Sequence, residues 1–212
     1  MNLHNHEEIF YTAWNKSGYA SIELPPLDVN RVIVNDYPGV EGLSLTRTQL
    51  WEMEVKKAAR PDLFISSVVK EGTARAWGRQ ILKNGDVVFI RVSEQRLWLQ
   101  PQSYGTVIEA CYLNHSNQQV TFIGLPKVED DAGQILYATQ KQPLFHVTHG
   151  VSGEEKQPLN TWRIVHLEND PNDLLHERFE IMSGAQGLPE YVEYYIESSL
   201  NVQLTRNSLT PN

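Results

Sequence analysis

A β-hairpin signature between Thr73 and Val92 constrains this chain more than any other feature. Asn84-Gly85 separates two runs that are rich in β-branched and aromatic residues. Asn and Gly both tolerate the positive φ that a two-residue type I′ turn requires, and this turn matches the twist of paired strands. We therefore predict a two-residue hairpin loop with Lys83 opposite Asp86.

The predicted register assigns side chains to two faces, because they alternate along a strand. It places Trp77 opposite Val92 and Arg75 opposite Glu94. We expect the more apolar face to point inward. That face carries Trp77, Ile81, Val88, Ile90 and Val92 together with Arg75, Arg79 and Glu94.

The charges on this face need partners if the face is buried. Arg75 and Glu94 are expected to pair across the strands, whereas Arg79 has no evident partner within the hairpin. Two interpretations of Arg79 stay open. Either it lies near a sheet end and its head group reaches water, or it meets an anionic or carbonyl-bearing ligand.

The composition is typical of one globular domain. The 212 residues include 41% hydrophobic and 21% charged residues, with a formal net charge of −8. We predict a single domain over residues 1–212, with an N-terminal arm at 1–20 and a flexible tail at 205–212. The acidic balance argues against nucleic-acid binding, which needs a basic surface.

The single cysteine, Cys111, excludes an intramolecular disulfide and suits a reducing compartment. The first ten residues lack the basic region and apolar run of a signal peptide. No apolar run approaches the ~20 residues of a membrane span. We therefore expect a cytoplasmic protein without a membrane span.

The order of predicted elements indicates an α+β protein. Strand-like residues 21–34 are broken at Pro25-Pro26, a helix follows Thr46 or Thr48, and a second short helix begins at Pro61. About six strands follow between 72 and 168, with a polar loop at 150–158. Two helices then begin near Asp170 and Pro189. We expect a curved antiparallel sheet of six or seven strands packed on the C-terminal helices.

This order of elements, over roughly residues 20–200, resembles the helix-grip fold of the START and Bet v1-like superfamily. In that fold a curved sheet wraps a long C-terminal helix. The resemblance implies a cavity between sheet and helix that accepts a small hydrophobic or aromatic molecule. The chain departs from the pattern at 183–187, where Gly184 and Gly187 divide the helix in two. The alternative is a lipocalin-like β-barrel, although its N-terminal Gly-x-Trp signature is absent.

The predicted inward face supplies candidate ligand-binding residues. They are Trp77, Arg79, Ile90 and Glu94 from the hairpin, Trp98 if the strand keeps its register, and Tyr112 or Cys111 from the next strand. Aromatic rings with a few polar groups are typical of a ligand pocket. The same rings would also suit a plain core.

We expect no metal and no cofactor. His4 and His6, followed by two glutamates, resemble half of a cupin metal motif, but the matching downstream half is missing. Glu129, Asp130 and Asp131 lack the ligand spacing of an EF-hand loop. No glycine-rich phosphate loop is present in the sequence.

Enzymatic chemistry has few candidates here. His146 and His149 are expected on opposite faces of one strand, and Cys111 lies in an apolar strand where a thiol is usually inert. General acid or base chemistry would need Glu94, Glu109 or His146 in the cavity.

Three functions stay open: a small-molecule binding protein, a cofactor-free cyclase, isomerase or lyase, and a protein-interaction or assembly factor. The third would use an acidic C-terminal helix that carries Glu190, Tyr191, Glu193, Tyr194 and Glu197.

Overall fold

The computed structural model describes residues 5–183 and 187–206. The helices are α1 His6–Trp14, α2 Val29–Asp36, α3 Arg47–Ala59, α4 Pro61–Phe64, α5 Leu174–Ser183 and α6 Glu190–Ser199. The strands are β1 Ala20–Asp28, β2 Arg75–Ile81, β3 Val87–Leu97, β4 Gln100–Asn114, β5 Gln119–Gly124, β6 Lys127–Glu129, β7 Ile135–Tyr137, β8 Phe145–Glu154 and β9 Gln157–His166. His4 and the predicted tail beyond Arg206 lie outside the described residues.

Seven strands form one antiparallel sheet in the order β1-β9-β8-β5-β4-β3-β2, and β6 pairs only with β7. The sheet is open, because its edge strands β1 and β2 do not pair with each other. This confirms the predicted α+β class with its antiparallel sheet, and the lipocalin-like alternative is wrong. Within the described ranges, no helix has the length and apolar character needed to cross a bilayer.

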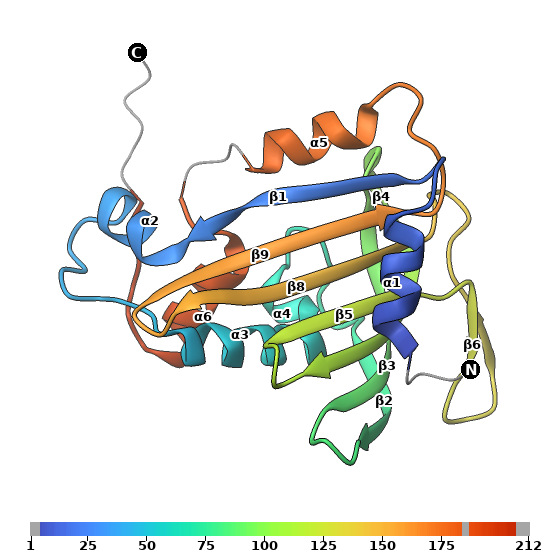
Figure 1. The fold of residues 1–212 in the computed structure, drawn as a ribbon, viewed down its shortest axis with the longest axis horizontal. Helices are drawn as coiled ribbons and strands as arrows, with labels where there is room; N and C mark the ends of the chain where they lie inside the picture. Colours follow the sequence, from blue (N-terminus) through green and yellow to red (C-terminus); the bar gives the residue numbers. More distant parts are fainter. Residues whose placement is uncertain (1–4, 184–186, 207–212) are drawn as a thin grey trace.

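Helices cover both faces of the sheet (Figure 1). We call the face beneath α3 and α6 the inner face, and the face crossed by α1 the outer face. The larger core cluster lies on the inner side and includes Leu50, Phe122, Phe179 and Ile196. A smaller cluster on the outer side includes Phe10 of α1, so part of the predicted N-terminal arm is a helix packed on the sheet.

Helix α3 begins where the sequence predicts. The Thr46 side chain accepts from the Gln49 amide, and the Gln49 side chain accepts from the Thr46 amide, which completes a capping box. The predicted strand over Val29–Val34 is wrong, because these residues belong to α2. Asp28 caps that helix by accepting from the Arg31 amide, which outweighs the β-branched composition.

The hairpin loop has three residues instead of the predicted two. The Gly85 amide donates to the Leu82 carbonyl at 3.0 Å, and the Leu82 amide donates to the Asp86 carbonyl at 2.8 Å. Gly85 has a φ of +86°, whereas Asn84 is not among the residues with positive φ. This is the pattern of a type I turn followed by a left-handed glycine. The type I′ prediction is therefore wrong.

The extra residue and a second irregularity change the register. Between Trp77 and Gln80 the β2–β3 ladder shifts at Gly78, so Trp77 pairs with Ile90 instead of Val92. Arg75 pairs with Val92 in the ladder, and its side chain forms ion pairs with Asp130 and Asp131. The predicted Arg75–Glu94 pair is wrong.

The prediction that the Trp77 face points inward is also wrong. In β3 the buried residues are Val87, Phe89, Arg91, Ser93, Gln95 and Leu97, along with Val88 near the turn. Ile90 and Val92 pack on the outer cluster, and Arg79 is exposed. The inward face was predicted from its larger number of aliphatic residues. This criterion failed, because the inner face carries polar residues whose partners are also buried.

The predicted polar loop at 150–158 is wrong as well. β8 and β9 continue through this segment and pair as far as Glu154 with Gln157. Gly153 supports the tight end of this hairpin with a φ of +78°. The two faces of β8 do separate His146 and His149 as predicted, since His149 packs on the inner side and His146 on the side of α1.

Candidate functional site

A cavity of about 180 Å³ lies between the inner face of the sheet and the helices that cover it. Its aromatic wall is formed by Trp98, Phe122, Phe145, Trp162 and Tyr191. The Phe179 ring of α5 lies 4.8 Å from the Trp98 ring and 4.9 Å from the Trp162 ring, centroid to centroid. These contacts hold both indoles at one end of the cavity.

Only Trp98 of the predicted ligand-binding residues lines this cavity. β3 ends at Leu97, where the β3–β4 register shifts, and this turns Trp98 away from the outer face on which Trp77 lies. Trp77, Arg79 and Ile90 are not cavity residues. Glu94 is half-exposed and pairs with Lys70 at 3.0 Å.

Cys111 and Tyr112 occupy opposite faces of β4. The Tyr112 hydroxyl donates to Asp86 at 2.6 Å, and burial together with this bond raises the pKa of Tyr112 to about 12. Its ring stacks on His6 of α1 with the centroids 3.2 Å apart. Cys111 is buried in the inner core, where burial raises the pKa of its thiol far above the usual value. The thiol therefore stays protonated and inert.

Five polar residues complete the cavity wall: Lys57, Arg91, Gln95, Glu109 and His149. Arg91 and Glu109 lie opposite each other in the β3–β4 ladder, and both are buried. The Arg91 Nε donates to Glu109 Oε2 at 3.0 Å, and its Nη1 donates to the Ala58 carbonyl at 2.8 Å. The pair thereby ties two strands to the end of α3.

Lys57 and Glu54 form a second buried ion pair, with side chains only 2% and 0% exposed. The Lys57 Nζ lies 2.8 Å from Glu54 Oε1 and 2.7 Å from Oε2. Burial opposes ionisation of Glu54, but the Lys57 charge together with the interaction with His149 outweighs it and lowers the pKa of Glu54 to about 2. Asn160 donates to Glu54 at 2.9 Å, and the Tyr191 hydroxyl donates to Asn160 at 2.7 Å.

His149 is the third member of this cluster. Its Nδ1 lies 2.7 Å from the Lys57 Nζ. Burial, reinforced by the Lys57 charge, lowers the pKa of His149 to about 4, so the imidazole is neutral at pH 7. The Phe122 and Trp162 rings pack against it edge-on at 5.5 and 5.7 Å.

Comparison with known proteins identifies the fold of this chain. No protein-family model matches the sequence, and no curated protein matches it. Among solved structures, the Zhui aromatase/cyclase from a Streptomyces species is similar with a TM-score of 0.51 at 9% identity, covering 85% of this chain and 96% of that one. The chain has the helix-grip fold. Ara h 8.0201 superposes over 87% of this chain and 100% of its own, at 7% identity and a TM-score of 0.49.

The helix-grip fold brings the polar cluster together from distant parts of the chain. Glu54 and Lys57 come from α3, whereas His149 and Asn160 come from β8 and β9. Sequence reasoning missed Glu54, Lys57 and Arg91. A signal was present in α3, because Glu54 falls within the apolar stripe that runs from Trp51 to Ala58. A charge in such a stripe needs a buried partner.

The acid–base candidates His146 and Glu109 lie on opposite sides of the sheet. His146 is buried toward α1, where its Nδ1 accepts from the Gly124 amide at 3.1 Å. Glu109 does line the cavity, but it is held by Arg91.

The predicted acidic face of α6 makes contacts within the chain: Glu190 accepts from Ser67, Glu193 from Tyr37, and Glu197 from the Leu204 amide. A protein partner at α6 stays a prediction.

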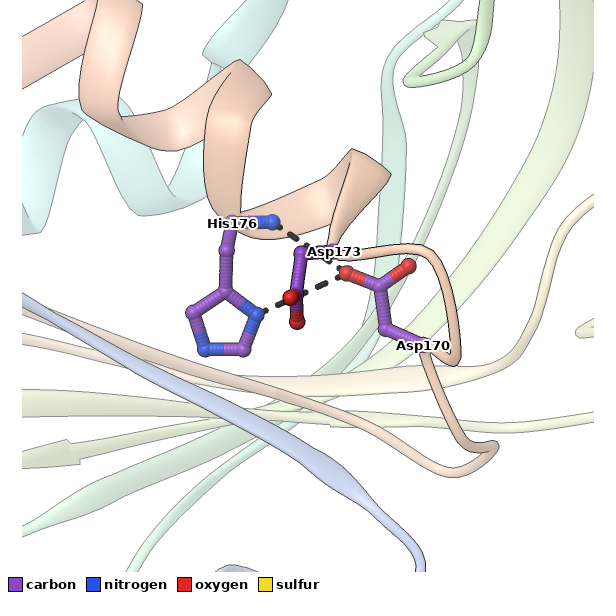
Figure 2. Close-up of side chains that lie close together, drawn as sticks. All are labelled: Asp170, Asp173 and His176. Atoms are coloured by element: carbon purple, nitrogen blue, oxygen red, sulfur yellow. Dashed lines mark hydrogen bonds and ion pairs between the residues drawn. The ribbon is translucent and has the colours of Figure 1, made fainter.

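Asp170, Asp173 and His176 bring their potential ligand atoms within 4.8 Å of one another at the start of α5 (Figure 2). Asp170 Oδ2 accepts from the Leu175 amide at 2.8 Å and the His176 amide at 3.3 Å. Asp170 therefore binds the first turn of α5, but the predicted helix start directly after Asp170 is wrong, because α5 begins at Leu174. These bonds hold Asp170 beside His176.

Proposed function

We propose that this protein binds a small hydrophobic or aromatic molecule in the cavity between the sheet and the helices. The observation that carries the proposal is the cavity itself, which is lined by aromatic and aliphatic side chains and has a polar wall. An apolar cavity of about 150 Å³ is large enough to bind a benzene ring. The space of about 180 Å³ in this protein therefore suits a ligand of one or two rings.

The polar wall favours binding over acid–base catalysis. Glu109 already accepts from Arg91, and His149 Nδ1 already lies against the Lys57 ammonium. Both groups that would act as a general base in this cavity thus lie against a cation. A nearby cation stabilises the charged form of Glu109 and disfavours protonation of His149, which makes both weaker bases, so we place binding ahead of a cofactor-free cyclase, isomerase or lyase.

The proposal is tested with two probes, 2-acetylnaphthalene and 2-ethylnaphthalene, titrated against the intact chain while tryptophan fluorescence is followed. We expect one molecule to bind per chain. Native mass spectrometry of the protein as purified gives an independent search for a molecule already bound.

Cavity-filling variants locate the binding. Val147→Phe and Val68→Phe each add a ring to a residue that lines the cavity, so we expect each to weaken binding at least tenfold. Arg79→Ala, on the exposed edge strand, is the matched control and should leave binding within twofold. Circular dichroism and urea unfolding establish that each variant is folded. The proposal fails if neither probe binds, or if folded cavity-filling variants bind as the wild type does.

A further inference from the structure

We infer that His149 selects ligands that carry a hydrogen-bond acceptor oxygen, because the Lys57–Glu54 pair holds its ring as a fixed N–H donor. The inference rests on the proposed binding function and names the ligand class: a neutral apolar molecule with a carbonyl or a comparable acceptor. It assigns Lys57 and Glu54 a positioning role behind His149.

The tautomer of His149 follows from the chemistry of its neighbour. An ammonium group has three donors and no acceptor. Since the Lys57 Nζ lies 2.7 Å from His149 Nδ1, that nitrogen must accept. In a neutral imidazole the other nitrogen, Nε2, then carries the proton. The competing contact from His149 Nδ1 to Glu54 Oε2 is 3.5 Å, which is too long to compete with the Lys57 bond.

The Lys57 ammonium is itself held on several sides. It donates to Glu54 Oε1 at 2.8 Å, its Nζ lies 2.7 Å from Glu54 Oε2 as an ion pair, and it lies 3.7 Å from the centre of the Tyr191 ring. Glu54 is fixed by Asn160, which in turn accepts from the Tyr191 hydroxyl. Because each member has its own partner, rotation of the His149 ring would leave a buried ammonium proton without an acceptor.

The Nε2 atom remains for the ligand. Within the part of the chain that the structure describes, the contacts of His149 with Lys57 and Glu54 both use Nδ1. Its side chain lines the cavity and keeps 16% of its surface exposed. An N–H group that faces a largely apolar space is poorly solvated, and a ligand oxygen would supply an acceptor for it.

Charge balance decides between a neutral and an ionic ligand. Lys57 is paired with Glu54, Arg91 is paired with Glu109, and His149 is neutral. The polar wall therefore has no net charge to offer a carboxylate or an amine. A ketone, ester or aryl ether supplies an acceptor without the desolvation cost of a charged group.

The two naphthalene probes measure this selection directly. They are close in size, and only 2-acetylnaphthalene has an acceptor oxygen. In His149→Leu we expect the Kd of 2-acetylnaphthalene to rise about fivefold more than the Kd of 2-ethylnaphthalene, relative to wild type. This factor corresponds to the loss of one hydrogen bond. An unchanged ratio of the two Kd values with both probes bound overturns the inference and leaves the proposed function intact. Failure of both probes to bind the wild type overturns both.

A spectroscopic measurement tests the positioning role. The ¹⁵N shifts of His149 at pH 7 should show a neutral ring with its proton on Nε2, and Lys57→Met/Glu54→Gln should lose this preference for one tautomer. The double variant removes both charges, so that no buried charge is left unpaired. A wild-type ring that is charged, or that carries its proton on Nδ1, overturns the inference.

Discussion

Arg91 and Glu109 face each other across β3 and β4 on the inner face, each almost entirely buried, and form an ion pair in the cavity wall. Arg91 also packs its guanidinium 4.6 Å from the centre of the Phe122 ring. Desolvation offsets much of the attraction in such a pair, whereas removal of one partner leaves an uncompensated charge.

We predict a strongly unequal response to single and double replacement of this pair. Arg91→Met and Glu109→Leu should each lower the free energy of unfolding by about 3–5 kcal/mol, because each leaves the other charge buried without a partner. The double variant should be more stable than either single variant. Urea unfolding monitored by circular dichroism measures all three. A double variant less stable than both single variants would show that an unpartnered buried charge is not the cause of the losses.

The buried imidazole of His166 makes stability dependent on pH. Its side chain is 0% exposed, and neither ring nitrogen has a hydrogen-bond partner among the described residues. Burial lowers the pKa of His166 to about 4, with the nearby Asp170 charge opposing the shift. The unfolded chain, with an ordinary pKa near 6.5, therefore takes up a proton that the folded chain does not.

The sign of this linkage is destabilisation by acid. The contribution of His166 is fully present above pH 6.5 and is lost as the pH falls toward 4, up to about 3 kcal/mol. His149, with its pKa also lowered to about 4, acts in the same direction. We predict that His166→Leu makes the free energy of unfolding less dependent on pH in this window. It should also stabilise the protein at pH 7 by about 1 kcal/mol, since two unsatisfied atoms are removed. Urea unfolding at pH 7, 5.5 and 4 measures both effects, and an unaltered pH profile would refute the assignment.

Two tryptophans on opposite faces offer a matched comparison. Trp98 lines the cavity, whereas Trp77 packs beneath the Arg75 guanidinium, 4.7 Å from the ring centre. Trp98→Ala should weaken binding of 2-acetylnaphthalene at least tenfold, because it removes an aromatic wall. Trp77→Ala should change the Kd by less than twofold. Isothermal titration calorimetry gives both constants, and equal losses from the two variants would argue against a ligand in the cavity.

Two glycines should resist substitution for different reasons. A Cβ on Gly124 would lie 2.3 Å from the Phe145 carbonyl oxygen, so Gly124→Ala must move the backbone of β8. Gly78 has open space around it but a φ of +66°, so Gly78→Ala only strains its own conformation. We predict losses of about 3 kcal/mol for Gly124→Ala and about 1 kcal/mol for Gly78→Ala. Thermal unfolding measures the loss of stability in each variant. A larger loss for Gly78→Ala than for Gly124→Ala would show that the backbones of β5 and β8 can move apart at little cost.

The amino-acid sequence by itself determined the local elements and their order. Thr46 and Gln49 mark the start of α3, because a capping box acts within one helical turn. Apolar runs rich in β-branched and aromatic residues mark β4 and β5 in the same way. Since the helix-grip fold is recognised by this order, local signals were sufficient to predict it.

Only the tertiary structure decided which face of the hairpin lines the cavity. One extra residue at Gly85 and one irregularity near Gly78 together moved the register by two residues, so Trp77 still lies on the face of Ile90 and Val92. Short-range propensity could not show that the opposite face is buried, because Arg91 meets Glu109 and the Ala58 carbonyl only in the folded chain. The Lys57–His149 contact spans 92 positions of the chain, and a contact of that range exists only when the sheet has closed over α3. The polar end of the cavity is therefore a product of packing, because buried charges are tolerated only where the fold brings their partners to them.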